Sequence, residues 1–375
     1  MSFLDRPRSV WFRRAIFRLH LWVGVLVALY VVVVSVTGAA LVFRIQMQRA
    51  VYPELFTSSR DGPIADMATV VERVQAAYPR MRVSGVDAPT SDRPTHLAYV
   101  VDAERFEAVL IDPVTAEILG TLPDHPLVSW LQRLHFDLLA GDTGRVVNGI
   151  GATAVVLLVL TGVVVWWPGR SGWWRAAIVD WRRPWKRTTW ELHGAVGIWT
   201  AVFTMLWAVT GLYFAFPATF RATVDRLSPL SVVASPQSVV PPGRSLTQGW
   251  RAVIDAARVH DGGHIARVLA PFDASGAFQV QFTDEQPTPT GAPALRPVYL
   301  NQYTGARLPT PATQPSVGDL MMRWVAPLHV GNFGGVGVRL AWMLFGLAPA
   351  VLAVTGLVLW WTRVAWPRLA PVPSD

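Results

Sequence analysis

Residues 19–24 read Leu-His-Leu-Trp-Val-Gly and residues 192–197 read Leu-His-Gly-Ala-Val-Gly, and each stretch opens a long apolar run. The first run continues to residue 43 and the second to residue 216. A helix crosses the hydrocarbon core of a bilayer with about 20 apolar residues, so both runs are long enough to span it. The two stretches therefore predict two membrane-spanning segments of similar design.

The whole chain contains four such runs, and its composition agrees with a membrane protein. Hydrophobic residues make up 52% of the 375 residues and charged residues only 15%. Backbone groups in lipid must form their hydrogen bonds within the segment, so we expect all four runs to be helices. They cover residues 19–43, 146–167, 192–216 and 338–361.

An internal duplication is indicated by matched residues at matched spacings. In the first and third runs, 17 residues separate a histidine from the threonine of a Thr-Gly pair. For the second and fourth runs, a histidine precedes a Trp-Trp pair by 31 residues, and an arginine follows that histidine by ten. The matched sets are His20 and Thr37 with His193 and Thr210, and His135, Arg145, Thr161 and Trp166 with His329, Arg339, Thr355 and Trp360.

The positive charge of the chain lies beside the predicted spans, and the remainder of the chain is close to neutral. By the positive-inside rule, both termini and the connection 168–191 are cytoplasmic, and the two long connections lie outside. This distribution argues against nucleic-acid binding as the reason for a pI near 10.5. The basic residues concerned are Arg6, Arg8, Arg13, Arg14, Arg18, Arg170, Arg175, Arg182, Arg183, Lys186, Arg187, Arg363 and Arg368.

Each long outer connection carries the pattern of a helix packed on a small antiparallel sheet. The predicted fold class is therefore an integral membrane α-helical protein, in which a duplicated four-helix transmembrane bundle carries two small α+β domains. The pattern consists of helix candidates at 65–78 and 246–259, strand-like runs at 97–101, 108–111 and 277–282, turn signals after Asp112 and Asn301, and proline-rich segments at 235–242 and 307–315.

The first run is expected to be an uncleaved signal anchor, because its apolar stretch is longer than the core of a secretory signal. The predicted order is N-terminus (1–18), first span (19–43), first outer domain (44–127), interfacial segment (128–145), second span (146–167), cytoplasmic loop (168–191), third span (192–216), second outer domain (217–325), interfacial segment (326–337), fourth span (338–361) and C-terminus (362–375).

Four of the eight histidines occupy the repeated positions. The topology places His20 and His193 at the cytoplasmic side and His135 and His329 at the outer side, so a bundle holds one facing pair in each leaflet. Since the chain has no cysteine, thiolate-bound centres and c-type haem are excluded. Two facing imidazoles suit axial ligation of b-type haem, so we expect two bis-His b-type haems that carry electrons across the membrane. Ordinary helix-packing histidines are the alternative.

Arginines near these histidines are candidate partners for haem propionates, because a guanidinium binds a carboxylate bidentately. Arg145 and Arg339 lie near the outer pair, and Arg14 and Arg187 each precede an inner histidine by six residues. Membrane orientation and snorkelling explain the same residues.

Other features have structural explanations. The Thr-Gly pairs allow close helix approach or make room for a flat macrocycle, and the Trp-Trp pairs fit an interfacial belt. The glycines of 149–154 begin a span with no strand before them, so they are not a dinucleotide fingerprint. The unmatched histidines, expected at the surface, are His96, His125, His260 and His264.

Three motifs together resemble the PepSY-associated transmembrane family: the His-to-Thr-Gly spans, the run Leu-His-Phe-Asp-Leu-Leu-Ala-Gly at 134–141, and Trp-Trp-Pro at 166–168. The outer segments are similar to PepSY domains, so the resemblance covers nearly the whole chain. The second copies differ, because residues 328–334 lack the Leu-Leu pair and residues 360–362 read Trp-Trp-Thr.

The resemblance implies a four-span reductase of the bacterial inner membrane, with b-type haems on His20, His135, His193 and His329. It would pass electrons outward to a ferric siderophore or another ferric chelate in the periplasm and release Fe(II). No cytoplasmic segment is large enough to bind a nucleotide, so a separate cytoplasmic or quinol donor is expected. No side chain is assigned a catalytic role, and membrane lipid is the remaining partner.

Two other functions are compatible with the same sequence. The spans could anchor a binding or regulatory protein that has no redox cofactor, or the histidines could serve a metal-ion transporter as transient ligands. Both predict a protein without a stable chromophore. A transporter would be expected to carry carboxylates within its spans, and the four runs contain essentially none.

Overall fold

The computed structural model describes residues 11–58, 61–103, 105–123, 126–169, 172–231, 236–240, 249–283, 295–309 and 315–366. Outside these ranges lie Arg6, Arg8, His125, Arg170, Arg368 and parts of both proline-rich segments. The chain forms two compact units. The helical unit comprises Met1–Phe43, Pro126–Pro229 and Val317–Asp375, and the sheet unit comprises Arg44–His125 and Leu230–Ser316.

Four long helices of the helical unit are long and apolar enough to cross a membrane. They are α1 (Trp11–Leu41), α5 (Gly141–Trp166), α7 (Trp185–Ala215) and the stretch Gly335–Ala365, made of α11 (Gly335–Gly346), α12 (Ala348–Trp360) and a final π-helical turn (Trp361–Ala365). The chain is therefore a membrane α-helical protein, as predicted. Two helices begin seven or eight residues before the predicted spans, because arginine is a good helix former that an apolar count omits.

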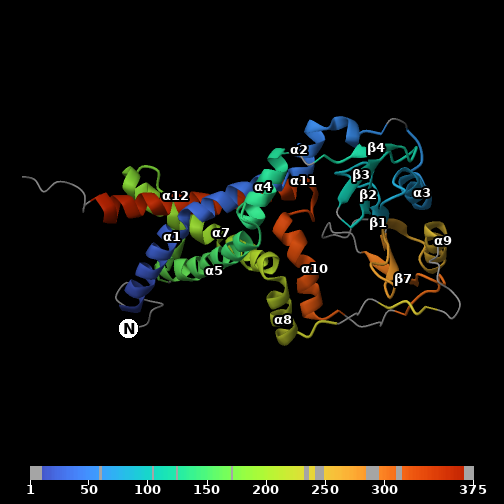
Figure 1. Ribbon diagram of the computed structural model, residues 1–375. Coiled ribbons are helices and arrows are strands. Elements are labelled where there is room, and N and C mark those ends of the chain that lie inside the picture. The colour runs from blue at the N-terminus through green and yellow to red at the C-terminus, as the bar shows by residue number, and fades with distance from the viewer. Residues whose placement is uncertain are drawn as a thin grey trace, which may run out of the picture. The chain divides into compact units, whose positions relative to one another are not determined.

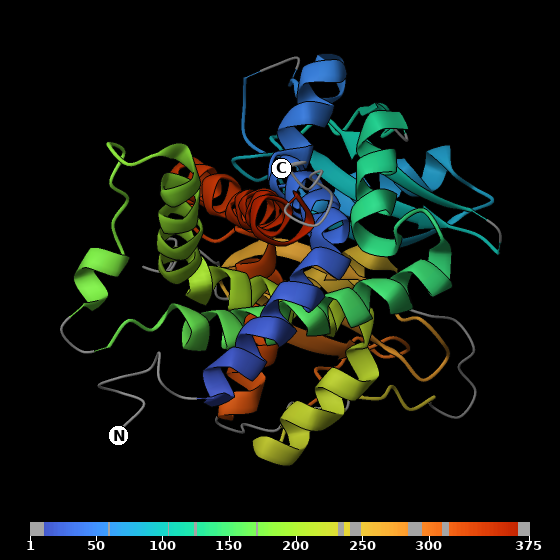
Figure 2. The same ribbon diagram turned by 90° about the vertical axis from the view of Figure 1, so that its left-hand side faces the viewer.

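The four long helices form a closed ring. Helices α1 and α7 each pack against both α5 and α12 (Figures 1 and 2). Consequently α1 and α7 face each other diagonally, as do α5 and α12, and side chains from a diagonal pair can meet in the centre of the bundle.

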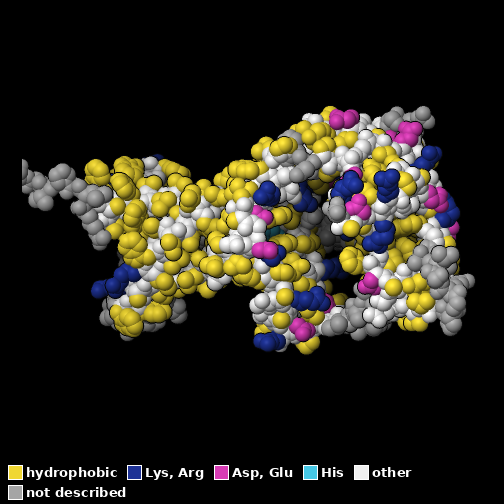
Figure 3. Space-filling model, viewed as in Figure 1, with side chains coloured by type: hydrophobic (Ala, Val, Ile, Leu, Met, Phe, Trp, Pro, Cys, Tyr) yellow, Lys and Arg dark blue, Asp and Glu magenta, His cyan; other side chains and the backbone are white. Residues whose placement is uncertain are grey.

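The outer surface of this ring is apolar. Hydrophobic side chains make up most of the visible face of the long helices (Figure 3). On the spanning helices, Leu26, Leu29 and Val202 are 76–83% exposed. Because water penalises so large an apolar patch, the surface is suited to lipid.

Short helices complete the helical unit: α4 (Pro126–Asp137), α6 (Trp173–Ala176), α8 (Pro217–Leu227) and α10 (Val317–Val330). The chain turns sharply from α4 into α5 through Leu138 and Leu139, whose φ angles are 51° and 62°. After α10 the corresponding turn uses Gly331, with φ 78°. The departure from the Leu-Leu motif therefore keeps a left-handed turn after both outer histidines, and glycine adopts it with less strain.

The sheet unit is one seven-stranded antiparallel sheet in the order β4-β3-β2-β1-β5-β6-β7, with helices packed on it (Figure 1). Helix α3 packs on β1 and β2, α9 packs on β6 and β7, and the two helices contact each other over a shared core. The elements are α2 (Arg44–Val51), a 3₁₀ turn (Pro53–Phe56), α3 (Met67–Ala77), β1 (Arg82–Asp87), β2 (His96–Val101), β3 (Phe106–Ile111), β4 (Ile118–Thr121), α9 (Trp250–His260), β5 (His264–Leu269), β6 (Ala277–Thr283) and β7 (Arg296–Asn301).

Each of the two long connections supplies a helix and antiparallel strands, as predicted, but one seven-stranded sheet takes the place of two small separate domains. Strands β1 and β5 pair between Gly85 and Leu269 and between Asp87 and Arg267. The Arg267 guanidinium donates to the buried Asp87 carboxylate, with Nη2 2.8 Å from Oδ2. This pairing gives the backbone N–H and C=O groups of β1 and β5 hydrogen-bond partners. Left unpaired, the edge strand of a half-sheet is a site of aggregation.

His96 corrects one prediction, because it is 1% exposed rather than at the surface. It begins β2, opposite Ile111 on β3. Burial lowers the pKa of its imidazole to about 4, since the charged form loses its hydration. His260 and His264 are exposed, as predicted.

Candidate functional site

His20 and His193 meet inside the helical unit. They come from the diagonal helices α1 and α7, and their ring centres lie 6.3 Å apart at an interplanar angle of 84°. The Nδ1 atom of His20 is 3.0 Å from Thr161 Oγ1 on α5, and the Nδ1 atom of His193 is 2.9 Å from Thr355 Oγ1 on α12. The flanking helices thus orient the two imidazoles of the inner pair.

His135 and His329 form a second pair of the same kind. They lie on α4 and α10, with ring centres 6.2 Å apart at an interplanar angle of 53°. The Nδ1 atom of His135 is 3.1 Å from Thr37 Oγ1 on α1, and the Nδ1 atom of His329 is 2.7 Å from Thr210 Oγ1 on α7. All four threonines are those of the Thr-Gly pairs.

The threonines determine which imidazole nitrogen carries the proton. Each threonine hydroxyl donates its single hydrogen to the backbone carbonyl four residues earlier, over 2.7 Å in every case. Its oxygen must therefore accept a hydrogen bond from the histidine, so Nδ1 carries the hydrogen. His135 shows the same tautomer independently, because its Nδ1 is also 3.1 Å from the carbonyl oxygen of Val34, which can only accept. In each neutral ring, Nε2 keeps the lone pair that a metal ion needs.

The glycines of the Thr-Gly pairs leave space for these rings. A Cβ atom at Gly38 would lie 2.8 Å from Cε1 of His135, and one at Gly162 or Gly356 would lie 3.2 or 3.3 Å from Cε1 of an inner histidine. Gly211 differs, because the nearest atom to its added Cβ is Ala152 Cβ at 3.8 Å. A side chain at Gly38 would therefore force the imidazole or the helix to move, whereas at Gly162 and Gly356 a shift of a few tenths of an ångström would make room for it.

Indole and amide side chains anchor the segments that carry the outer histidines. Asn148 on α5 donates through Nδ2 to the carbonyl of His135 over 2.7 Å, and the hydroxyl of Tyr30 donates to Asn148 Oδ1 over 2.7 Å. In the second half, Trp342 donates to the carbonyl of Leu328 over 2.7 Å and Trp207 donates to that of His329 over 3.1 Å. In both halves, side-chain N–H groups thus hold the backbone beside the histidine, but the residue types differ: an asparagine in the first half and two tryptophans in the second.

The sequence reasoning missed these anchors, although a signal was present. Asn148 and Trp342 each follow an outer histidine by 13 residues, and Tyr30 and Phe203 each follow an inner histidine by ten. In the first half, Tyr30 and Asn148 form a hydrogen bond. In the second half, the equivalent residues Phe203 and Trp342 form an aromatic contact, with ring centres 5.9 Å apart. A comparison restricted to identical residues cannot find such positions.

The geometry of both pairs fits a metal ion between two imidazoles. Two rings that bind one ion from opposite sides, with metal–nitrogen distances of about 2.0–2.1 Å, have their centres roughly 6 Å apart. Within the part of the chain that the structure describes, no group of three or more His, Cys, Asp or Glu side chains is placed to hold a metal ion. Each histidine pair therefore offers two ligand nitrogens and no third protein ligand among the described residues.

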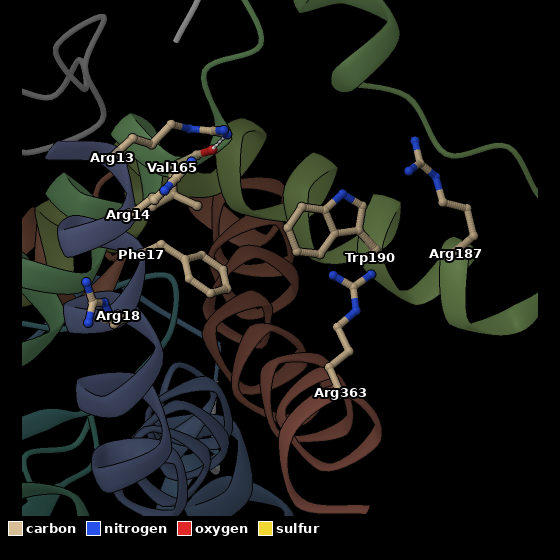
Figure 4. A pocket seen from close by; sticks show the side chains of 8 residues that line it. All are labelled: Arg13, Arg14, Phe17, Arg18, Val165, Arg187, Trp190 and Arg363. Carbon is tan, nitrogen blue, oxygen red and sulfur yellow. Dashed lines mark hydrogen bonds between the residues drawn. The ribbon is translucent and has the colours of Figure 1, made fainter. Parts of the chain in front are cut away.

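The four candidate arginines are placed in three different ways. Arg14 and Arg187 line one cavity at the end of the helical unit, together with other arginines (Figure 4). Arg145 is exposed and its Nη2 lies 2.9 Å from Asp142 Oδ1, whereas Arg339 is only 6% exposed inside the bundle. The matched positions Arg145 and Arg339 are thus not equivalent in burial.

The family described as the PepSY-associated TM region matches residues 17–363. That range contains all four histidines, their threonine partners and the whole sheet unit. No curated protein matches the chain.

Proposed function

Since the chain belongs to the PepSY-associated transmembrane family, we propose that it is a transmembrane electron-transfer protein with two bis-His b-type haems, which reduces a ferric siderophore or another ferric chelate. His20 and His193 would ligate one haem, and His135 and His329 the other. The support is the tautomer imposed on each histidine, because a neutral imidazole with a free Nε2 is the form that binds iron.

A haem held by each histidine pair would supply a one-electron carrier. The chain's own residues hold the ligands still. The threonines fix each ring through Nδ1, Asn148 and the two tryptophans fix the backbone of the outer pair, and the apolar ring of helices excludes water. Arg14, Arg187, Arg145 and Arg339 remain the proposed propionate partners.

The repeated contacts support an origin by internal duplication. In each half, a histidine on a long helix contacts a threonine on the next span, and a histidine on a short helix contacts a threonine on the preceding span. We place both termini in the cytoplasm and the sheet unit in the periplasm of a bacterial inner membrane, because of the arginines near the ends of the spans. His20 and His193 then form the inner centre, and His135 and His329 the outer one.

The proposed reaction is a single electron transfer at the outer side. Fe(III) in the chelate accepts one electron and becomes Fe(II), which oxygen-rich chelators hold weakly, so the iron is released without an acid–base catalyst. The electron comes from a separate donor, a quinol or a reduced cytoplasmic carrier.

An absorption spectrum of the purified protein tests the proposal most directly. Spectra of the oxidised and dithionite-reduced protein, with pyridine haemochrome quantification, should give b-type bands and two haems per chain. His193→Ala and His329→Ala should each remove one haem, and His260→Ala, at an exposed position, should remove none. A colourless protein, or equal haem content in all three variants, would exclude the proposal and favour an anchored binding protein.

A further inference from the structure

A cavity of about 610 Å³ lies beside the start of α1, the end of α5, the start of α7 and the end of the fourth spanning stretch. Its wall is built from three spanning helices: α1, α7 and the end of the fourth span, with one residue of α5 (Figure 4). The lining residues are Arg13, Arg14, Phe17, Arg18, Val165, Arg187, Trp190 and Arg363.

The cavity holds a large excess of positive charge. Five of its lining residues are arginines, and none of the described lining residues is acidic. One of these arginines is paired, because Glu191 Oε1 lies 2.7 Å from Nε of Arg187. Among the described residues Arg14, Arg18 and Arg363 form no ion pair, and haem propionates on Arg14 and Arg187 would leave Arg18 and Arg363 for another anion.

Aromatic and apolar side chains give the cavity a second character. The Arg363 guanidinium lies 4.4 Å from the centre of the Trp190 ring, a cation–π contact that holds both side chains in place. The Phe17 ring points toward the same space from α1 (Figure 4). A ligand with both anionic and apolar parts fits such a lining better than a simple ion does.

The cavity lies about one helical turn from the inner histidine pair. Phe17 precedes His20 by three residues, and Trp190 precedes His193 by three. Val165 follows Thr161, the hydrogen-bond partner of His20, by four. One turn of an α-helix rises about 5.4 Å, so an occupant would sit at the level of the lipid headgroups and close to the inner pair.

We propose that this cavity binds the headgroup of an anionic phospholipid that carries two phosphates, a lipid of the cardiolipin type. The two phosphates accept hydrogen bonds from Arg18 and Arg363, and the acyl chains leave over Phe17 along the apolar helix surface. Basic pockets between spanning helices on the cytoplasmic side recognise such headgroups. The site rests on the membrane orientation of the proposed function, but no haem takes part in the binding.

Native mass spectrometry of the full-length, delipidated protein in detergent tests the proposal. Cardiolipin should bind about tenfold more tightly than phosphatidylglycerol, which offers one phosphate, because the second phosphate engages further guanidinium groups. The variant Arg18→Ala with Arg363→Ala should lose about tenfold in cardiolipin affinity. Arg175→Ala with Arg182→Ala removes the same charge from exposed positions outside the cavity and should change the affinity by less than about twofold.

Two results would overturn the proposal. Equal losses in the two double variants would show that general surface charge attracts the lipid. Displacement of cardiolipin by an equal concentration of inorganic pyrophosphate would show a site for a soluble diphosphate. The pyrophosphate competition uses the unmodified protein, so it decides the matter even where a double variant fails to fold. Haem content, read from the absorption spectrum, reports separately on the electron-transfer proposal.

Discussion

Thr210 and His329 are 119 residues apart in the chain, and the Thr210 oxygen accepts a 2.7 Å hydrogen bond from the His329 imidazole. The same threonine donates its own hydrogen to the Leu206 carbonyl over 2.7 Å. One hydroxyl thus joins α7 to α10 and leaves Nε2 of His329 as the nitrogen with a lone pair. Three further Thr–His contacts repeat this relationship, so all four imidazoles are held with Nε2 as the nitrogen that has the lone pair.

Replacing Thr210 with valine should weaken the outer centre. Valine keeps the shape of threonine but removes the hydroxyl oxygen that accepts from His329. The buried Nδ1–H of His329 then loses this acceptor, and the ring is free to turn or to change tautomer. We expect about a tenfold loss of haem affinity at the outer centre, measured by haem titration of the apoprotein, and a changed midpoint potential. Thr210→Ser keeps the hydroxyl and is the matched control; if serine and valine behave alike, the hydrogen bond does not orient the ligand.

Replacing Thr37 with valine should have a smaller effect than replacing Thr210. His135 Nδ1 keeps a second acceptor, the Val34 carbonyl at 3.1 Å, whereas Thr210 is the acceptor found for His329 among the described side-chain contacts. The two valine variants can be compared in the same haem titration. A larger loss of haem affinity for Thr37→Val than for Thr210→Val would show that the Val34 carbonyl does not replace the threonine as the acceptor for His135.

A methyl group at Gly38 should disturb the outer pair. The Cβ of Gly38→Ala would lie 2.8 Å from the His135 ring, so the ring or the α1 helix must move. Gly211→Ala is a close control. It adds the same methyl group to the matched Thr-Gly pair, where the added Cβ would lie 3.8 Å from its nearest neighbour, Ala152 Cβ. We expect Gly38→Ala to lower the melting temperature and alter the outer-centre spectrum. Gly211→Ala should be neutral or stabilising by up to about 1 kcal/mol, since alanine favours helix.

Asn148→Asp should destabilise the segment that carries His135. The aspartate has nearly the same shape but cannot donate, so the His135 carbonyl loses a 2.7 Å hydrogen bond and faces a carboxylate. A lost buried partner costs about 1–3 kcal/mol, which denaturant unfolding of the full chain can resolve. Tyr30→Phe removes only the hydroxyl bond to Asn148 and should cost less; the reverse order would assign the anchor to Tyr30 instead.

Acid should destabilise the sheet unit through His96. The pKa of this buried imidazole is about 4 in the folded protein and about 6.5 when unfolded. The unfolded state therefore binds the proton first, and the stability present above pH 6.5 is lost as the pH falls toward 4. The loss amounts to about 3 kcal/mol. Thermal melts between pH 7 and pH 4 should show less pH dependence for His96→Met than for the exposed control His264→Met, and identical curves would exclude His96 as the cause.

Much of the helical unit follows from the sequence alone. The four apolar runs predict the four long helices, because lipid leaves a spanning backbone no other way to satisfy its hydrogen bonds. The register of His20 with His193, and of His135 with His329, predicts two matched pairs. Local pattern also predicts α3 and α9, since an amphipathic face is written into consecutive residues.

Only the tertiary structure decides which residues complete each site. The threonine that holds a histidine lies 98 to 162 residues away and on another helix, so neither spacing nor composition can pair them. The same holds for the β1–β5 pairing, which turns two half-sheets into one. The burial of His96 is a third case, because no local feature of the sequence distinguishes it from the exposed His264. Sequence determines periodicity and hydropathy, which are properties of neighbouring residues, whereas contacts between distant segments depend on how the helices and strands pack.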